Sequence, residues 1–537
     1  MPQLSQATKK LINRYQQWHQ SLQPKEGRIT IHVDEVASKV AAFYEKIRGI
    51  IDWKEEHLMR RAAIIRKLKR HFVNWEIINF SGEIAEPLVL ELIRGGHFPN
   101  DKIEEAKIAE VQKVINKYIF IFKNSITAKK RKRKLQFYNW LLEIAACEIE
   151  ETLCPFRKER ALIDYMFELM KERIVLNEGA IAIKKVKDEE KDIQIYIAVQ
   201  QALFKLDRPI IGYNLLKYKF PQWKNNPPRE WLLEITKNIY IIWDDIKKDL
   251  SHLLGKKFYT ICEKYDTPYL LLGDVLTEEN PTEISKKISE PEELETLIKK
   301  AYRKRLSTLK SRLSRAAFYS TLSILLTNAL SLVILEIPLA KLITGRFTPI
   351  TILVDILGPT FLMFLFVVTI KLPSKNNLNL VIMETMKIVY GKVDTYEIKI
   401  LKERGVITRF IIGLIYLFGA CISLGIIFGI FELAKFPPTS VIINIIFVAL
   451  ITFAGLAIKK RGKELTIEEK PGGFLGFLSD ILLLPMAGLG RWLSNKWKKY
   501  NAIAAFFSAL IDMPFWVFVE FLEQWRNFLK EKKEEIH

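Results

Sequence analysis

Cysteine and histidine are scarce in this 537-residue chain, which contains four cysteines and seven histidines. The cysteines form no CxxC pair, so neither a disulfide framework nor a zinc site of the usual spacing is expected. We expect all four to be buried and reduced: Cys147, Cys154, Cys262 and Cys421. The chain also lacks HExxH, Walker A and GxSxG motifs. The sequence therefore predicts no cofactor, no metal site and no enzymatic activity.

Acidic residues are too few to balance the basic ones, since 82 Lys and Arg face 61 Asp and Glu for a net charge of +21. The excess is spread over the chain, with 58 against 44 in residues 1–316 and 24 against 17 in residues 317–537. Such a charge suits nucleic acid or an anionic membrane surface. No RNP-like, helix-turn-helix or zinc pattern accompanies the basic run at 129–134, so nucleic acid is not the expected partner. That run, in an expected loop, is interpreted as solvated surface or membrane contact.

Four apolar stretches are long enough to cross a bilayer, which takes ~20 helical residues. They are residues 317–343, 348–370, 410–431 and 440–457. The loop 371–409 carries eight Lys and Arg, and more basic residues follow the fourth stretch directly. The positive-inside rule then places this loop and both termini in the cytoplasm. The opening MPQLSQATKK has no apolar h-region, so no cleavable signal peptide is expected.

The fold class indicated is all-α, because strand-like alternation is scarce on either side of the four stretches. Residues 1–316 form an expected helical cytoplasmic domain of one or two subdomains, in which residues 34–72 make one amphipathic helix with a solvated basic face. Residues 317–457 form the transmembrane region, and residues 458–537 the C-terminal region. Its two apolar segments, 473–493 and 502–522, contain Asp and Pro, and the second carries its Phe and Trp side chains on one side. We interpret them as amphipathic helices at the membrane surface, with a spanning or re-entrant hairpin as the alternative.

A basic cluster directly precedes the first stretch. Eight Lys and Arg lie within seventeen residues: Lys299, Lys300, Arg303, Lys304, Arg305, Lys310, Arg312 and Arg315. Clusters of this kind attract anionic headgroups at roughly 1 kcal/mol per charge close to the surface. The sequence therefore predicts a site for anionic lipid, which also fixes the orientation of the first span.

Glu336 and Asp355 are the carboxylates placed deepest in the predicted spans. In an antiparallel hairpin they would reach similar depth, about 10 Å from the outer ends. Facing carboxylates in low dielectric can share a proton or hold a cation. If each span is one turn shorter, both residues lie at the outer interface beside Lys341. Both interpretations remain open.

Cys421, Gly425 and Gly429 recur every four residues in the third stretch. Small residues at this spacing let helix backbones approach closely, so they predict a packing face. We expect that face to contact another helix of the same chain, with a dimer contact as the alternative.

Three segments resemble a set of uncharacterised membrane proteins of candidate-phyla bacteria: VDEVASKVAAFYEKIRGIIDWKEEHLMRRAAI, ELIRGGHFPNDKIEE and LGRWLSNKWKKYNAI. The similarity covers most of the chain and implies a bacterial cell membrane. It implies no activity, cofactor or site residue.

Three functions follow in order of support. The first is a non-enzymatic anchor or scaffold in the inner membrane, which presents the helical domain to a protein partner at a surface of anionic headgroups. The second is an ion or proton transporter or channel that uses Glu336 and Asp355. A membrane-bound enzyme comes third, since no acid, base and nucleophile share a sensible spacing.

Overall fold

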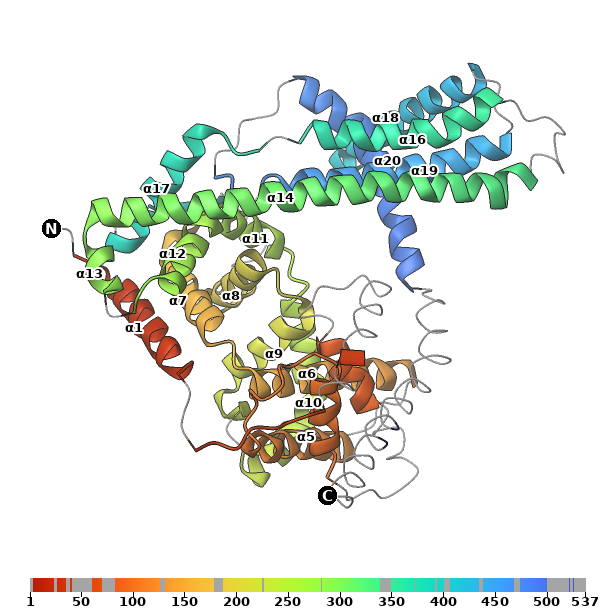
Figure 1. Cartoon of the computed structure of the whole chain (residues 1–537). Coiled ribbons are helices and arrows are strands. Elements are labelled where there is room, and N and C mark those ends of the chain that lie inside the picture. The colour runs from red at the N-terminus through yellow and green to blue at the C-terminus, as the bar shows by residue number, and fades with distance from the viewer. Residues whose placement is uncertain are drawn as a thin grey trace, which may run out of the picture. The chain divides into compact units, whose positions relative to one another are not determined.

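The chain folds into two compact units, which are described separately (Figure 1). The computed structural model describes residues 3–23, 27–34, 39–40, 60–69, 83–125, 131–177, 187–224, 227–281, 283–338, 349–370, 372–391, 394–399, 406–433, 438–467, 474–499, 521 and 525. Unit 1 comprises Met1–Ile12, Glu172–Lys185 and Lys264–Asn501, and unit 2 comprises Asn13–Lys171, Val186–Glu263 and Ala502–His537. The predicted segment 502–522, apart from residue 521, and most of the predicted helix 34–72 lie outside the described residues.

Unit 2 is a helical assembly whose helices end where the sequence places their stop signals. Gly96, at a φ of 70°, follows the helix that ends at Arg94, and Pro155 separates two further helices. Asp207 caps another by accepting a hydrogen bond from the amide of Ile210. Its elements are the second part of α1 (Gln6–Ser21), residues 60–69, α4 (Ala85–Arg94), α5 (Ala106–Asn124), α6 (Arg131–Leu153), α7 (Arg157–Arg173), α8 (Asp188–Phe204), α9 (Arg208–Lys219), the 3-10 turn η1 (Pro221–Lys224), α10 (Arg229–Asp249) and α11 (Gly255–Lys264).

Unit 1 joins a polar base to a bundle of apolar helices. The base contains the start of α1, α12 (Asp266–Glu278), α13 (Ile284–Ser289), α17 (Lys375–Tyr390) and a two-stranded parallel sheet of β1 (Ile174–Asn177) and β2 (Tyr396–Lys399). The bundle contains α16 (Pro349–Val368), α18 (Val406–Leu433), α19 (Pro438–Arg461) and α20 (Phe474–Lys499). One helix, α14 (Pro291–Ser331), belongs to both, and the π-helical turn η2 (Leu332–Glu336) continues it. At 1.5 Å per residue its 41 residues extend about 60 Å.

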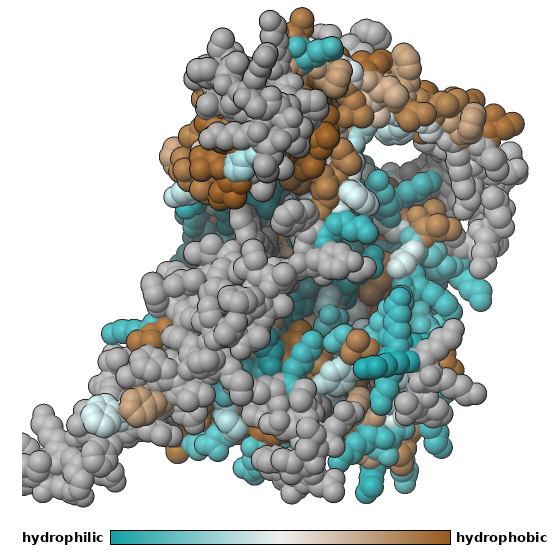
Figure 2. Space-filling model, turned by 90° about the vertical axis from the view of Figure 1, so that its right-hand side faces the viewer, coloured by the Kyte–Doolittle hydropathy of each residue, from teal (hydrophilic) through white to brown (hydrophobic). Residues whose placement is uncertain are grey.

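Three helices are long and apolar enough to cross a membrane among the described residues, so the prediction of four is confirmed only in part. They are Pro291–Ile334, Phe410–Leu433 and Val441–Arg461. The second predicted span corresponds to α16, where the apolar helix Ile356–Val368 is shorter. Figure 2 shows hydrophobic side chains gathered over the bundle, at the top of the view. Large apolar side chains such as Phe418, 67% exposed, face outward there, as lipid contact requires.

Helix α20 runs across the bundle rather than along it (Figure 1). The hydroxyl of Ser423 on α18 donates to the carbonyl of Leu482 on α20 at 2.8 Å. A Cβ added at Gly419 would stand 2.6 Å from the carbonyl oxygen of Ile481, so this glycine allows the two backbones to approach closely. Gly419 lies near the middle of α18. Both interpretations of residues 473–493, at the membrane surface or as a spanning or re-entrant hairpin, stay predictions.

The Asn377 side chain holds the base of unit 1 together. It is fully buried and comes from α17, within the predicted loop 371–409. Its amide nitrogen donates to the hydroxyl of Tyr302 on α14 at 3.0 Å and to the carbonyl of Leu465 at 2.7 Å, and its oxygen accepts from the amide of Ile467 at 2.9 Å. The loop 371–409 and the segment after α19 therefore lie at the same end of the bundle, beside the polar half of α14.

The start of α1 packs on α17, the helix that carries Asn377. The hydroxyl of Thr8 donates to the carbonyl of Val389 at 3.1 Å, and the amide of Ser5 donates to the same oxygen at 3.0 Å. The described parts of the predicted cytoplasmic segments, residues 3–12, 372–391, 394–399 and 462–467, thus form one folded base. The all-α class is confirmed for the described residues, with β1 and β2 as a small addition.

Replacing Asn377 tests this base. Asn377→Ala leaves three buried polar partners unpaired, and we expect it to lower the free energy of unfolding by about 3 kcal/mol. The measurement is a denaturant titration of the protein in detergent. The neighbouring Asn376 is exposed, so Asn376→Ala should change stability by less than about 0.5 kcal/mol. Equal effects of the two variants would contradict this role for Asn377.

Candidate functional site

The basic cluster divides into two halves. Four of its members form ion pairs with acidic side chains: Lys299 with Glu295, Lys300 with Glu279, Lys304 with Glu278 and Arg305 with Asp274. Three of these carboxylates belong to α12 or the residue after it, so these pairs fix α14 to the base. For these cations, predicted as lipid ligands, part of the charge is already balanced within the protein.

The other half is exposed, and three of its four members lie nearest the apolar segment of α14. Arg303, Lys310, Arg312 and Arg315 have no carboxylate partner among the described residues. Phe318 and Tyr319 follow and are 64% and 63% exposed. The surface of α14 therefore changes from basic to aromatic and apolar within one helical turn, as expected where a helix enters a bilayer.

Glu336 and Asp355 stand on η2 and α16. Their side chains lie outside the described part of the structure. The proposed pairing of the two carboxylates stays a prediction.

Cys421, Gly425 and Gly429 lie on α18. A Cβ added at Gly425 or Gly429 would meet no described atom within 4 Å, and Cys421 is exposed. The packing within the chain uses Gly419 and Ser423 instead, on another face of α18. The predicted face is open in the described structure, and its role stays a prediction.

Two cations on the basic face of the helix at 60–69 are buried, whereas Lys69 on the same helix is exposed. Arg61 is 4% exposed and makes two hydrogen bonds of 2.7 Å to Asp207, while Lys67 is 2% exposed and pairs with Glu91 at 2.6 Å. The interpretation as solvated surface is wrong for these two side chains. Burial raises the pKa of the nearby Glu150 to about 7, although Arg60 and Arg61 oppose the shift.

The expectation that all four cysteines are buried is also wrong. Cys154 and Cys421 are exposed, whereas Cys147 and Cys262 are buried. The basic run at 129–134 was expected in a loop, but residues 131–134 form the exposed first turn of α6. No group of three metal-ligating side chains occurs within the ranges that the structure describes.

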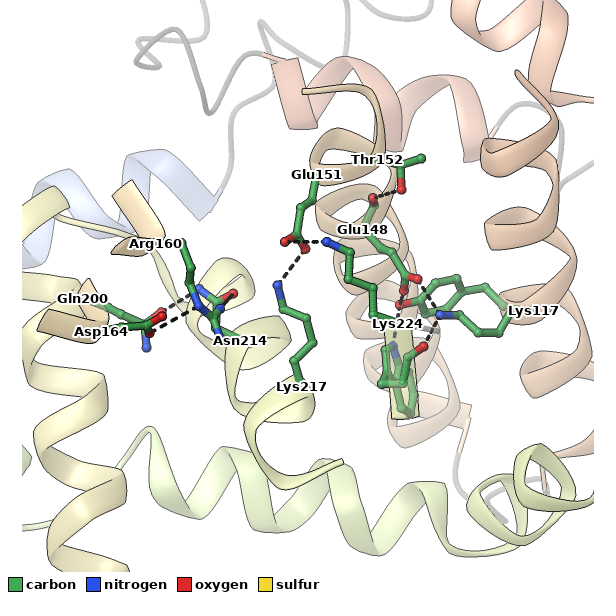
Figure 3. Close-up of polar contacts among 12 residues, drawn as sticks. Lys117, Glu148, Glu151, Thr152, Arg160, Asp164, Gln200, Asn214, Lys217 and Lys224 are labelled. Atoms are coloured by element: carbon green, nitrogen blue, oxygen red, sulfur yellow. Dashed lines mark hydrogen bonds and ion pairs between the residues drawn. The ribbon is translucent and has the colours of Figure 1, made fainter. Parts of the chain in front are cut away.

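A cleft of about 740 Å³ in unit 2 brings together residues that are far apart in the sequence. Side chains from α1, α5, α6, α7 and η1 line it. Figure 3 shows part of its polar lining, with Lys117 directed toward Glu148 and Lys224 toward Glu151, both glutamates of α6. Seven of the lining residues are Lys or Arg and three are Glu. The cleft is therefore a positively charged hollow built on helices.

One wall of the cleft is a buried ion pair. Lys117 of α5 donates to Glu148 of α6 at 2.5 Å and to the carbonyl of Trp223 at 2.8 Å. The hydroxyl of Tyr118 donates to the other oxygen of Glu148 at 2.6 Å. Burial lowers the pKa of Lys117, and the charge of Glu148 opposes this shift. With so many partners in fixed positions, this wall is rigid.

A second carboxylate at the cleft accepts hydrogen bonds from two lysines. Glu151 accepts from Lys217 at 2.6 Å and from Lys224 at 3.0 Å. Burial alone would raise the pKa of Glu151, but the two lysines outweigh it and lower this pKa to about 2. Burial lowers the pKa of Lys217 to about 8, against the effect of Glu151. One carboxylate shared by two cations leaves a net positive charge at the edge of the cleft.

Sequence reasoning missed this cleft. The available signal was a charged residue within an apolar stripe: Lys117 falls on the buried face of α5 beside Tyr118, and Glu148 falls beside Ile149 on α6. A charged side chain at such a position needs a partner, although the sequence does not say which.

The chain matches no protein-family model, no curated protein and no solved structure. The interpretation of its sites therefore depends on their own geometry.

The lowered pKa of Glu151 predicts a dependence of stability on pH. Above pH 4.5 the carboxylate is charged in both the folded and the unfolded chain, and its full stabilisation is present. As the pH falls from 4.5 towards 2, the unfolded chain takes up the proton first, and about 3 kcal/mol is lost. The difference in unfolding free energy between the wild type and Glu151→Gln should therefore shrink over this range. Denaturant titrations at several pH values measure it.

Glu230 provides the matched control, because it is an exposed glutamate on α10. Glu230→Gln should show no such trend. A wild-type advantage over Glu151→Gln that stays constant from pH 7 to pH 2 would disprove the proposed pairing.

Proposed function

We propose that the protein is an integral membrane protein which anchors a helical domain at an anionic membrane surface and acts there as a non-enzymatic scaffold for protein partners. The observation that carries this proposal is α14. The helix begins in the polar base, pairs there with α12, exposes four unpaired cations and ends in an apolar segment. One continuous helix thus joins a folded polar part to a bilayer-spanning part.

The unpaired half of the basic cluster is the proposed contact with headgroups. Arg303, Lys310, Arg312 and Arg315 are free to bind phosphate or carboxylate groups of lipids, since they have no carboxylate partner in the described structure. Each is expected to contribute up to roughly 1 kcal/mol near an anionic surface. The paired half anchors the helix to the base.

We further propose a bacterial inner membrane with both termini and the loop 371–409 in the cytoplasm. Support comes from the base, in which the N-terminal residues, α17 and the segment after α19 lie at one end of the bundle. Basic residues concentrate at that end, including Lys459 and Arg461 at the end of α19. The positive-inside rule assigns such an end to the cytoplasm.

Lipid retention tests the proposal. The triple variant Lys310→Gln, Arg312→Gln, Arg315→Gln should retain less anionic lipid than the wild type when purified from vesicles of mixed phosphatidylglycerol and phosphatidylethanolamine. Phosphorus NMR or mass spectrometry of the bound lipid measures the ratio. The control triple variant Arg131→Gln, Lys132→Gln, Arg229→Gln removes three exposed cations from α6 and α10 and should leave it unchanged. Equal retention by the wild type and the first triple variant would exclude the proposed contact.

A conduit for ions or protons is the second candidate. The observation in its favour is Asn328 in the apolar half of α14, which is 4% exposed and whose two amide atoms have no hydrogen-bond partner among the described residues. Polar groups buried inside a span are costly and frequently functional. The Asn328 amide would belong to the same bundle as Glu336 and Asp355.

Reconstitution distinguishes the two candidates. The scaffold proposal predicts no proton or cation flux above that of empty vesicles, measured with a pH-sensitive or potential-sensitive dye. The conduit predicts a flux that Glu336→Gln or Asp355→Asn reduces and that Glu432→Gln, an exposed control on α18, does not. Such a flux would contradict the scaffold proposal and support the conduit.

A further inference from the structure

The cleft of unit 2 holds more positive charge than its carboxylates can balance. Asp164 is shared by two arginines, since it accepts from Arg14 at 2.8 Å and lies 3.4 Å from Arg160. Glu151 is shared by Lys217 and Lys224 in the same way. Each shared carboxylate leaves one positive charge in excess, because each carries a single negative charge.

Two further cations have no carboxylate at all. Lys113 on α5 and Arg157 at the start of α7 line the cleft, are exposed, and make no ion pair with any described residue. Together with the shared pairs they bring the excess to four charges. The remaining lining cations, Lys107 and Lys117, are balanced by Glu110 and Glu148. An excess of this size inside one hollow favours a ligand with several negative charges.

The cleft also offers apolar surface beside these charges. Trp18 of α1 and Phe156, the residue before α7, both line it, and Phe156 is 36% exposed. The Nζ of Lys158 lies 5.1 Å from the centre of the Trp18 ring, which holds that ring in place. A ring fixed in this manner can contact a flat group of a ligand, whereas a simple anion would leave it unused.

The size of the cleft agrees with a ligand that has both parts. Pockets for small molecules and cofactors measure roughly 300–1,000 Å³, and the 740 Å³ of this cleft lies within that range. Arg157 and Arg160 belong to the first turn of α7, where the positive end of the helix dipole adds to the positive potential.

We propose that this cleft binds a small phosphate-bearing ligand with a planar ring, of which a nucleotide is the simplest case. Lys113 and Arg157 bind its phosphates, with Arg14, Arg160 and Lys224 in support. Trp18 and Phe156 contact its ring. The proposal is independent of the membrane function above, since every residue that it uses belongs to unit 2.

Calorimetric titration of the full-length protein in detergent with ADP, pyrophosphate and adenosine tests the proposal. ADP should bind most tightly, because it alone combines charge and ring. The double variant Lys113→Gln, Arg157→Gln should weaken the binding of ADP and of pyrophosphate alike, by about tenfold or more for each charge-assisted hydrogen bond that the substitutions remove. Trp18→Leu should weaken the binding of ADP and leave that of pyrophosphate unchanged.

The matched control is Arg229→Gln, Lys237→Gln, which removes one arginine and one lysine from the exposed face of α10 in the same unit. It should bind ADP as the wild type does. The proposal is overturned if ADP does not bind, if adenosine binds as tightly as ADP, or if the control double variant weakens ADP binding as much as Lys113→Gln, Arg157→Gln. The variants replace exposed or half-buried side chains, so circular dichroism should show them folded.

Discussion

The fully buried amide of Asn377 is the interaction on which unit 1 depends. It has three hydrogen-bond partners, which come from α14 and from the chain that follows α19. A buried amide with all of these partners satisfied costs little, but the same amide without them would be strongly destabilising. These three partners must meet around Asn377. Their meeting therefore fixes how the helices that leave the base enter the bundle. The polar segment between α16 and α18 thus helps to hold unit 1 together.

Ion pairs likewise fix the position of α14 in unit 1. The ion pairs of Lys300, Lys304 and Arg305 lie where α14 passes α12 and its end, whereas Arg312 and Arg315 further along remain unpaired. The same residue types in one continuous run therefore do two different things. Ion pairs at a protein surface contribute little each, so their main effect here is on the position of the helix rather than on stability. What remains unpaired is free to act outside the chain.

Helix content and the larger apolar segments could be predicted from the sequence, because they follow from local patterns. The apolar stretches of α18 and α19 appear where expected, and Gly95, Gly96 and Pro155, residue types that end helices, stand between helices in the structure. Solvent exposure of charged side chains was less predictable. Arg61 and Lys67 look like a solvated face by spacing alone, and only their partners Asp207 and Glu91, 146 and 24 residues away, make their burial possible.

The sequence by itself determined the all-α class, the basic excess and the presence of helices long and apolar enough to span a membrane, since composition and periodicity act over a few turns of helix. Only the tertiary structure decided which glycine of α18 allows close packing, which half of the basic cluster is unpaired and that five separate elements enclose a positively charged cleft. Each of these depends on which distant side chain supplies a carboxylate, a carbonyl or open space. Hydrogen bonds and ion pairs act over a few ångströms in space. Their partners can be far apart along the chain, so sequence spacing does not predict which residues pair.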